Sequence, residues 1–359
     1  MDILKHTLFL SLYVVLQEEN LVTGRERVRR ALTFQFPDHV PRELWVLPGV
    51  QMFRQAEMEG VLARFPPDFV APDATVGVGR KASGTPGVAG TYTDEWGCPF
   101  TVAEPGVIGE VKRPPLADWA ALDHLRPPDE VLDEADLSRV DAGCATADRF
   151  VKAGTTVRPF ERMQFLRGTE NLMMDLAWGV SQVYRLRDLV HEFFMREIAL
   201  WTETDVDGIS FMDDWGTQTN LLISPHMWRE VFKPLYADYC RLIHGAGKFV
   251  FFHSDGHIVS IIPDLIEIGV DALNAQLFCM DIEEIGRRFR GQITFWGEID
   301  RQWVLPFGTP DDVRAAVQRV RAALDNGQGG VIAECEWGND VPRANVEAVL
   351  KTWQEDTVL

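Results

Sequence analysis

Short runs rich in β-branched and aromatic residues alternate with amphipathic stretches along most of this chain. Eight such runs occur, at 44–47, 69–71, 156–160, 208–212, 249–252, 272–274, 293–296 and 331–333. This alternation is typical of repeated βα units around a parallel sheet, and eight units close a barrel. The sequence therefore predicts an α/β protein with a (β/α)8 TIM barrel.

The stretches between the runs carry signals for helix ends. Ser224 and Pro225 predict the start of a helix over 227–243, because serine caps a helix and proline fits its first turn. Thr309 and Pro310 do the same for a second helix. Its apolar stripe faces the sheet and consists of Val313, Val317, Val320 and Leu324.

Two segments depart from the barrel pattern. Turn-forming residues at 83–87 precede two short β-prone segments, so we expect a hairpin insertion at about 83–104 that caps the C-terminal face of the barrel. The apolar run at 8–16 is too short to span a bilayer, which needs about 20 residues. We expect residues 1–22 to form an N-terminal extension or docking helix, and residues 23–359 to form one barrel domain.

Charge and cysteine content exclude some classes of function. The chain has 54 acidic and 35 basic residues, a net charge of −19, which repels nucleic acids and anionic membranes. Five widely spaced cysteines without a CxxC pair predict reduced thiols and a cytoplasmic protein. We expect a small-molecule substrate, no nucleic acid and no membrane as partners; a homodimer is left open.

Polar side chains follow five consecutive predicted strands, at the barrel face where active sites form. They are Asp213 and Asp214, then His253 and Asp255, then Asn274 and Gln276, then Glu298, and last Glu334, Cys335 and Glu336. A single carboxylate in such a place is often a helix cap, and a single cysteine is often packing. Repetition at five strand ends favours a site, and imidazole, carboxylate and thiolate are groups that Zn²⁺ accepts.

Several ordered segments resemble the uroporphyrinogen decarboxylase superfamily. They include 24–32, 94–98, 252–256, 262–274 and 305–310. Within the superfamily the chain is similar to the branch that includes the cobalamin-dependent methyltransferases, whose fold is a (β/α)8 barrel. True decarboxylases bind substrate propionates with an arginine-rich segment. The equivalent positions of this chain, 44–51, contain no arginine.

The resemblance also implies a metal site. The methyltransferase branch binds Zn²⁺ through a His-x-Cys after the fifth strand, an acidic residue at the sixth and a cysteine after the eighth. His253 and Cys335 match two of these positions, Asp255 replaces the first cysteine, and Gln276 falls near the acidic ligand. The implied ligands of Zn²⁺, or of another divalent metal, are therefore His253, Asp255, Gln276 and Cys335, with Glu298 able to add a carboxylate.

The implied function is methyl transfer between a corrinoid and a thiol or similar acceptor. The corrinoid would be carried by a partner protein, because no cobalamin-binding module is visible in the chain. The candidate catalytic residues are Asp213, Asp214 and Glu298. The candidate cofactor contacts are Trp45, Trp96, Trp215 and Asn274, with core packing as the alternative for the tryptophans.

Two other functions are consistent with the sequence. One is a metal-free decarboxylase or lyase for a small carboxylate, with Asp213, Asp214 and Glu298 as acid and base. Arg158, Arg162 or Arg167 would then bind the substrate carboxylate. The other is a non-enzymatic binding protein on a barrel scaffold.

Overall fold

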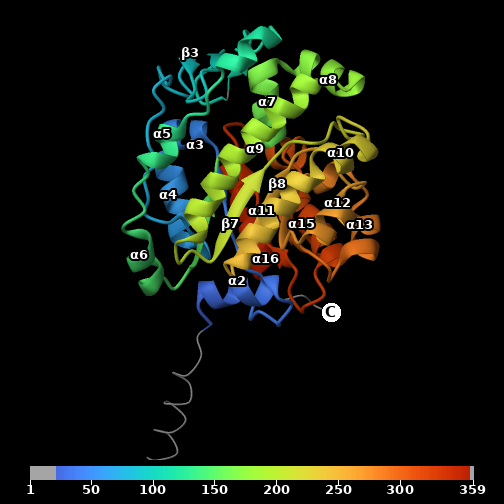
Figure 1. The fold of residues 1–359 in the computed structure, drawn as a ribbon. Helices are drawn as coiled ribbons and strands as arrows, with labels where there is room; N and C mark the ends of the chain where they lie inside the picture. Colours follow the sequence, from blue (N-terminus) through green and yellow to red (C-terminus); the bar gives the residue numbers. More distant parts are fainter. Residues whose placement is uncertain (1–21, 108, 356–359) are drawn as a thin grey trace, which may run out of the picture.

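A computed structural model describes residues 22–107 and 109–355. Eight parallel strands form a barrel inside a layer of helices (Figure 1), which confirms the predicted fold class. The predicted extension or docking helix falls almost entirely within residues 1–21 and so lies outside the described residues.

The barrel strands follow one another around the axis in chain order. They are β1 (Trp45–Val46), β2 (Phe69–Val70), β6 (Phe150–Gly154), β7 (Gly208–Met212), β8 (Phe249–Ser254), β9 (Ala272–Ala275), β10 (Thr294–Trp296), and β11 (Val331–Ile332) with β12 (Glu336–Trp337). β11 and β12 are two parts of the eighth strand. β12 pairs in parallel with β1, so that the eighth strand returns to the first.

The helices lie mostly outside the barrel. They are α2 (Gly24–Leu32), α3 (Pro48–Phe53), α4 (Gln55–Arg64), α5 (Asp129–Asp133), α6 (Val140–Thr146), α7 (Pro159–Arg167), α8 (Thr169–Trp178), α9 (Ser181–Thr202), α10 (Pro225–Val231), α11 (Lys233–Gly245), α12 (Ile262–Ile268), α13 (Ile282–Phe289), α14 (Val304–Phe307), α15 (Pro310–Leu324) and α16 (Arg343–Gln354), with 3-10 turns η1 (Trp119–His124) and η2 (Leu277–Cys279). None of the described helices combines the length and apolar composition that crossing a membrane requires.

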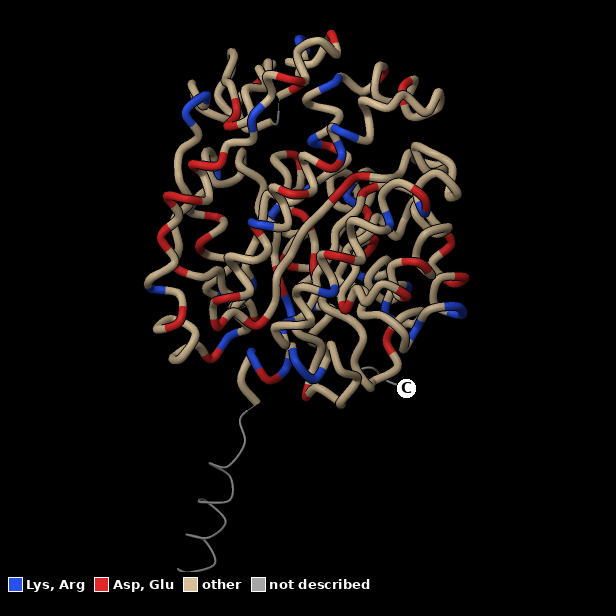
Figure 2. Tube along the Cα trace, in the orientation of Figure 1, with Lys and Arg blue, Asp and Glu red and all other residues tan. Residues whose placement is uncertain are grey.

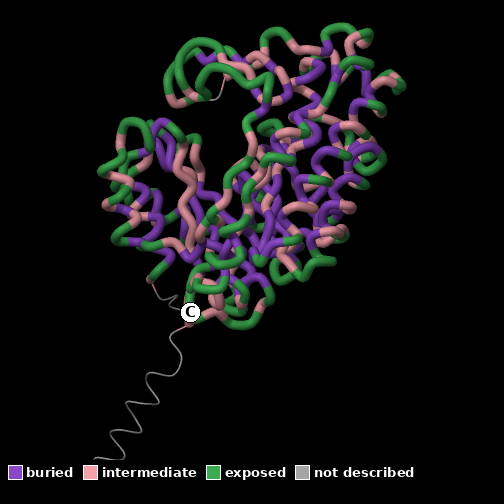
Figure 3. Tube along the Cα trace, turned by 60° about the vertical axis from the view of Figure 1, so that its left-hand side comes forward, coloured by how far each residue is buried: buried purple, intermediate pink, exposed green. Residues whose placement is uncertain are grey.

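Side chains alternate between the inside of the barrel and the helix layer, because successive residues of a strand point to opposite faces. The inner cluster includes Phe69, Phe150, Phe251, Trp296 and Ile332. The outer core, between strands and helices, includes Val151, Val250, Leu273, Phe295 and Val331. In Figure 3 the buried positions accordingly gather in the middle of the molecule and the exposed ones at its outside.

Helix α2 closes the N-terminal end of the barrel. Its Val28 and Leu32 belong to the inner cluster, so the helix buries an apolar face against the base of the strands. Arg25 and Arg29 on the same helix form ion pairs with the buried Asp207, just before β7. Figure 2 shows basic positions in the α2 region at the base of the molecule and acidic positions spread over the rest of it.

The third strand was predicted in the wrong place. The sequence favoured 156–160, but the strand is β6, and α7 begins at Pro159. Proline lacks the N–H that a central strand needs and fits the first turn of a helix, so the segment with the proline becomes the loop and helix start.

The predicted helix over 227–243 is two helices, α10 and α11, that meet at Phe232. Pro234 has no N–H to donate and its ring clashes with the carbonyl four residues earlier, so a continuous helix is broken there. Both predicted starts are confirmed. Ser224 accepts a hydrogen bond from the backbone N–H of Met227, and Thr309 forms a capping box with Asp312.

The predicted hairpin insertion is present as β3 (Gly90–Thr93) and β4 (Pro99–Val102), which pair in antiparallel fashion. A third strand, β5 (Glu110–Val111), adds to β4. Phe100 of β4 packs against Phe165 of α7, the helix that leaves the C-terminal end of β6. The small sheet therefore lies at the end of the barrel where the polar strand ends gather (Figure 1).

Candidate metal site

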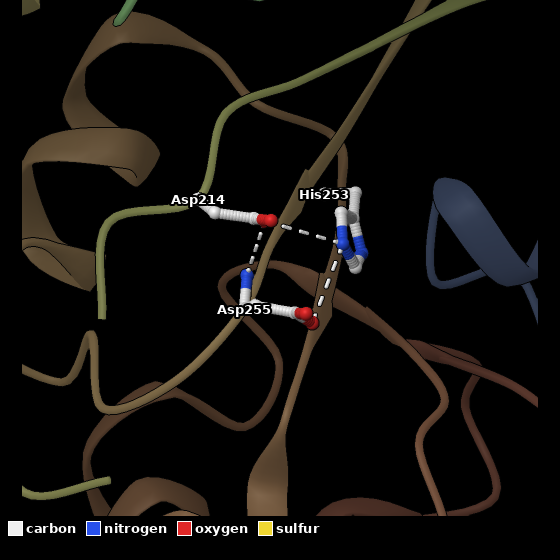
Figure 4. Close-up of side chains that lie close together, drawn as sticks. All are labelled: Asp214, His253 and Asp255. Atoms are coloured by element: carbon white, nitrogen blue, oxygen red, sulfur yellow. Dashed lines mark hydrogen bonds and ion pairs between the residues drawn. The ribbon is translucent and has the colours of Figure 1, made fainter. Parts of the chain in front are cut away.

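Three polar side chains meet at the C-terminal ends of two neighbouring strands. His253 belongs to β8, Asp255 follows that strand directly, and Asp214 follows β7. One ligand atom of each lies within 4.8 Å of the others (Figure 4). Met212 pairs with His253 in the parallel ladder, so β7 and β8 end at the same level and the residues just beyond them lie side by side. We call these three residues the triad.

Asn274 of β9 sets the orientation of the His253 ring. Asn274 Nδ2 donates to the carbonyl oxygen of Trp296 at 2.5 Å and to Glu334 Oε2 at 3.2 Å. The amide oxygen therefore faces the imidazole, with Oδ1 2.6 Å from His253 Nδ1. Because an amide oxygen only accepts, Nδ1 carries the hydrogen and Nε2 points toward the two aspartates.

The triad needs positive charge at its centre. His253 Nε2 lies 3.5 Å from Asp214 Oδ1 and 3.4 Å from Asp255 Oδ1. In the neutral ring the Nε2 lone pair would face two carboxylates, which is repulsive unless a proton or a metal cation lies between them. Burial by itself lowers the pKa of His253, but Asp255 and Asp214 outweigh it and the pKa is raised. The same carboxylates that favour the proton attract a cation.

Other groups fix the positions of both aspartates, but one carboxylate oxygen of Asp255 has no hydrogen-bond partner among the described residues. Arg301 forms an ion pair with Asp255 Oδ2, and the backbone N–H of Asp255 donates to Asp214 Oδ1 at 3.0 Å. Asp255 Oδ1 is buried and has no hydrogen-bond partner among the described residues. A buried carboxylate oxygen without a partner is costly, and a bound cation would satisfy it.

Two of the three separations in the triad fit a small divalent metal. Bonds of about 2.0–2.1 Å at tetrahedral angles place neighbouring ligand atoms about 3.3–3.4 Å apart. The imidazole-to-carboxylate distances of 3.4 and 3.5 Å are close to this value. One nitrogen and two oxygen donors make a harder set than one with thiolates, and three protein ligands leave a position for substrate.

Glu298, a predicted catalytic residue, lies just after β10 and is only 2% exposed. Its Oε1 lies 3.7 Å from Nη1 of Arg301, the residue that also holds Asp255. Burial raises the pKa of Glu298 to about 7. It lines a cavity of about 110 Å³ together with Arg301 and Gln276. A carboxyl group that titrates near neutrality beside a cavity can exchange a proton with a bound substrate.

Cys335, an expected metal ligand, does not point into the barrel. It belongs to the outer core with Val331, Ala333 and Trp337, the alternate residues of the same strand, and it is fully buried there. Ile332, at the opposite phase, belongs to the inner cluster. The expectation that Cys335 shares a cavity with His253 is therefore not met, because strand alternation turns the sulfur toward the helices.

Gln276, the other expected ligand, supports the site from outside the triad. Its Oε1 accepts a hydrogen bond of 2.8 Å from the backbone N–H of Gly256, in the loop that follows β8. The side chain therefore holds the loop that carries Asp255. The sequence placed an acidic group near this position, but the second carboxylate of the triad belongs to Asp214.

Asp213, a predicted catalytic residue, is a structural residue rather than part of the site. It is fully buried and accepts hydrogen bonds from the backbone N–H groups of Phe160 and Glu161 and from the hydroxyl of Tyr236. It thus anchors the start of α7 on the barrel. Its neighbour Asp214 points the other way, into the triad, because the side chains of successive residues in an extended segment point to opposite sides.

Two of the three tryptophans that were cofactor candidates are core residues. Trp96 is 1% exposed and packs against Phe193 of α9. Trp215 is fully buried and stacks on Phe160 with ring centroids 4.1 Å apart. Trp45 does reach the site, since its ring lies 5.1 Å from that of His253. For Trp96 and Trp215 core packing, the alternative explanation, is correct.

Of the three arginines that could bind a substrate carboxylate, two are engaged elsewhere. Arg162 is buried against Asp94, and Arg167 is buried against Asp175 at 2.7 Å. Arg158 is partly exposed, and its guanidinium lies 3.5 Å from Glu161. Arg158 is therefore the member of this set that remains near the mouth of the barrel.

Sequence reasoning missed two residues of the site, Glu161 and Arg301. Burial and the nearby Asp214 raise the pKa of Glu161. Glu161 directly follows the predicted run 156–160 but was not singled out; in the structure it lies in the first turn of α7, after β6. Arg301 lies in the same loop after β10, three residues beyond Glu298, and its charge at that position is the signal that could have identified it.

The chain is similar to known proteins in both sequence and structure. A family model described as uroporphyrinogen decarboxylase (URO-D) matches residues 91–355. A methyltransferase from Methanosarcina mazei is similar in structure, with a TM-score of 0.67 and 15% identity over 92% of this chain and 98% of that one. At that identity the likeness shows the fold.

A glycosylated endo-β-1,4-xylanase from Gloeophyllum trabeum is more distant. It has a TM-score of 0.45 and 10% identity, over 94% of this chain and all of that one, and supports no conclusion about function. A search of curated proteins returned no match.

Proposed function

Because the chain belongs to the uroporphyrinogen decarboxylase family, we propose that it is the kind of family member that transfers methyl groups with the help of a divalent metal. Asp214, His253 and Asp255 would hold the metal. The observation that carries the proposal is the triad itself, in which Asn274 directs a histidine lone pair at two carboxylates.

Methyl transfer is the reaction best supported by similarity. The sequence segments described above resemble the cobalamin-dependent branch, and a protein described as a methyltransferase has the same fold over nearly its whole length. The proposed substrates are a corrinoid carried by a partner protein and a thiol or similar acceptor. The methyl carbon leaves cobalt without the electrons of its bond, which stay on the corrinoid, and bonds to sulfur.

The metal, when bound, would favour the thiolate form of the acceptor, which is the nucleophile. The residues of the chain do the rest. Arg301 holds Asp255 so that its free oxygen faces the centre, and Asn274 keeps the imidazole in one orientation. Glu298, with a pKa of about 7, can take up the proton that the thiol releases.

The test combines metal analysis with an activity assay. The purified protein is loaded with Zn²⁺ and the bound metal is measured, then incubated with methylcobalamin and a panel of thiols while the visible spectrum of the corrinoid is followed. We expect about one metal per chain and thiol-dependent demethylation, and loss of both in His253→Ala. Full metal occupancy in His253→Ala would contradict the metal site.

The metal-free decarboxylase remains the second candidate, since Arg158 and Glu298 supply a cation and an acid near the mouth of the barrel. It requires no metal. Release of CO₂ from small carboxylic acids by protein treated with a chelator would favour it over methyl transfer.

A further inference from the structure

A cavity of about 530 Å³ enters the barrel at the seam between β1 and β2. At the base of the seam the backbone N–H of Asp68 donates to the carbonyl oxygen of Arg42 at 3.0 Å. Above this contact no ladder joins β1 to β2 within the part of the chain that the structure describes. The two strands diverge, and side chains from the barrel interior line the space between them.

A buried ion pair lies on the wall of this cavity. Lys152 of β6 points into the barrel, at the same phase as Phe150, and its Nζ lies 2.7 Å from Glu43 Oε2. The two side chains are 10% and 14% exposed. A lysine carries three N–H donors, and the described residues supply a single hydrogen-bond acceptor, Glu43, to Nζ. Lys152 Nζ therefore has N–H groups that can donate to a ligand in the cavity.

Aromatic rings form the neighbouring walls. Trp45 and Trp296 meet edge to face with ring centroids 5.1 Å apart, and both line the cavity. Lys152 Nζ lies 3.7 Å from the centre of the Trp296 ring. Flat rings of this kind bury a planar apolar ligand well, and the ammonium group beside them supplies a fixed polar contact.

From these contacts we infer that the cavity is a binding site for a small, uncharged, planar molecule with a hydroxyl group, of which phenol is the simplest example. The hydroxyl oxygen accepts from Lys152 and its hydrogen is donated to Glu43. The aromatic body of the ligand lies against Trp45 and Trp296.

The charge of the cavity selects against ions. Glu43 already compensates the charge of Lys152, so a carboxylate ligand would bring a second negative charge into a buried space. An ammonium ligand would meet the positive charge of Lys152. A neutral hydroxyl, which both donates and accepts, completes the hydrogen bonds without adding charge.

This site is distinct from the triad and adjoins it. Trp45 is shared, because its ring lines the cavity and also lies 5.1 Å from the ring of His253. The triad residues do not line the cavity. Binding there does not depend on the metal or on methyl transfer, so it can be tested separately.

Gly154 provides the variant that tests the site. It lines the cavity, and a Cβ built on it meets no atom within 4 Å. Gly154→Leu therefore adds a side chain to the cavity wall at a position where the Cβ has open space. Gly143 of α6 also has nothing within 4 Å of an added Cβ but lies away from the cavity, so Gly143→Leu is the matched control.

The experiment is isothermal titration of the full-length protein with phenol, toluene, benzoate and benzylamine. We expect phenol to bind at least tenfold more tightly than the other three, Gly154→Leu to lose binding at least a hundredfold, and Gly143→Leu to keep it. In Glu43→Gln/Lys152→Met, which removes both charges together, phenol should lose its advantage over toluene.

Four outcomes would overturn the inference. They are no binding of phenol, tighter binding of benzoate or benzylamine, unchanged binding in Gly154→Leu, and an unchanged preference in the double variant. Titration of His253→Ala distinguishes this inference from the proposed function. Phenol binding that survives there supports a separate cavity, whereas loss of binding, a fifth contrary outcome, would place the ligand at the triad instead.

Discussion

Asn274→Ala is the change that most directly tests the role of the histidine orientation. Asn274 makes no contact with the metal position itself, but its Oδ1 holds His253 Nδ1 at 2.6 Å. Without it the imidazole can rotate and Nε2 no longer points steadily at the two aspartates. Removing a residue that holds a metal ligand in place typically lowers metal affinity 10- to 100-fold, or about 1.4–2.7 kcal/mol.

The same substitution also affects folding, and a control is needed to separate the two effects. Asn274 donates to the Trp296 carbonyl and to Glu334, and leaving such buried groups unpaired costs about 1–3 kcal/mol each. Asn345 is an equally buried asparagine, 2% exposed, that donates to the carbonyls of Leu305 and Gly308, both at 2.8 Å. Asn345→Ala should therefore destabilise the fold without touching the triad.

The assay is competition for Zn²⁺ against a chromogenic chelator, with urea unfolding measured on the same variants without metal. We expect both variants to lose stability, and we expect Asn274→Ala alone to lose metal affinity. The reasoning is refuted if Asn274→Ala binds Zn²⁺ as tightly as the unchanged protein, or if Asn345→Ala weakens binding to the same extent.

Further predictions concern the residues that the structure reassigns. Cys335→Ala should retain metal and cost about 1 kcal/mol of stability, as measured by metal analysis and urea unfolding, because the sulfur lies in the outer core; loss of metal would restore it as a ligand. Asp213→Ala should cost more than 3 kcal/mol by leaving three buried donors unpaired, whereas Asp214→Ala should cost little stability and abolish metal binding; equal effects of the two on unfolding would contradict the assignment. The pKa of Glu298 is about 7 in the native state against 4.5 in the unfolded chain. Between these two pH values the native state keeps a proton that the unfolded chain has lost. The contribution of this group to the free energy of unfolding therefore falls by up to about 3 kcal/mol as the pH rises from 4.5 through 7. Glu298→Gln should flatten that part of the stability profile in urea melts, and an identical profile would rule out the titration.

The barrel could be predicted because its signals are local. Apolar runs, capping serine and threonine residues and turn-forming glycines each act over a few residues, and Ser224 and Thr309 do cap the helices that they were expected to start. The third strand failed for a reason that is also local. The run that contains Pro159 was taken as the strand although proline is a poor strand residue, whereas the strand is β6, which contains Lys152.

The buried lysine shows what a local pattern hides. A charged residue in the middle of an apolar strand argues against a strand when its partner is unknown. Lys152 is tolerated because Glu43, 109 positions earlier, lies beside it inside the barrel. That compensation is a long-range contact, and no window along the chain contains it.

The amino-acid sequence by itself determined the class of fold and the face on which the polar groups collect, and it singled out His253, Asp255 and Asp214 as candidate site residues. Tertiary structure decided which of those groups meet. A carboxylate one residue away from another, as at Asp213 and Asp214, or a thiol one residue from a carboxylate, as at Cys335 and Glu334, faces the opposite side of the strand. The register and the closure of the barrel, which depend on contacts between distant strands, select the side that faces the site.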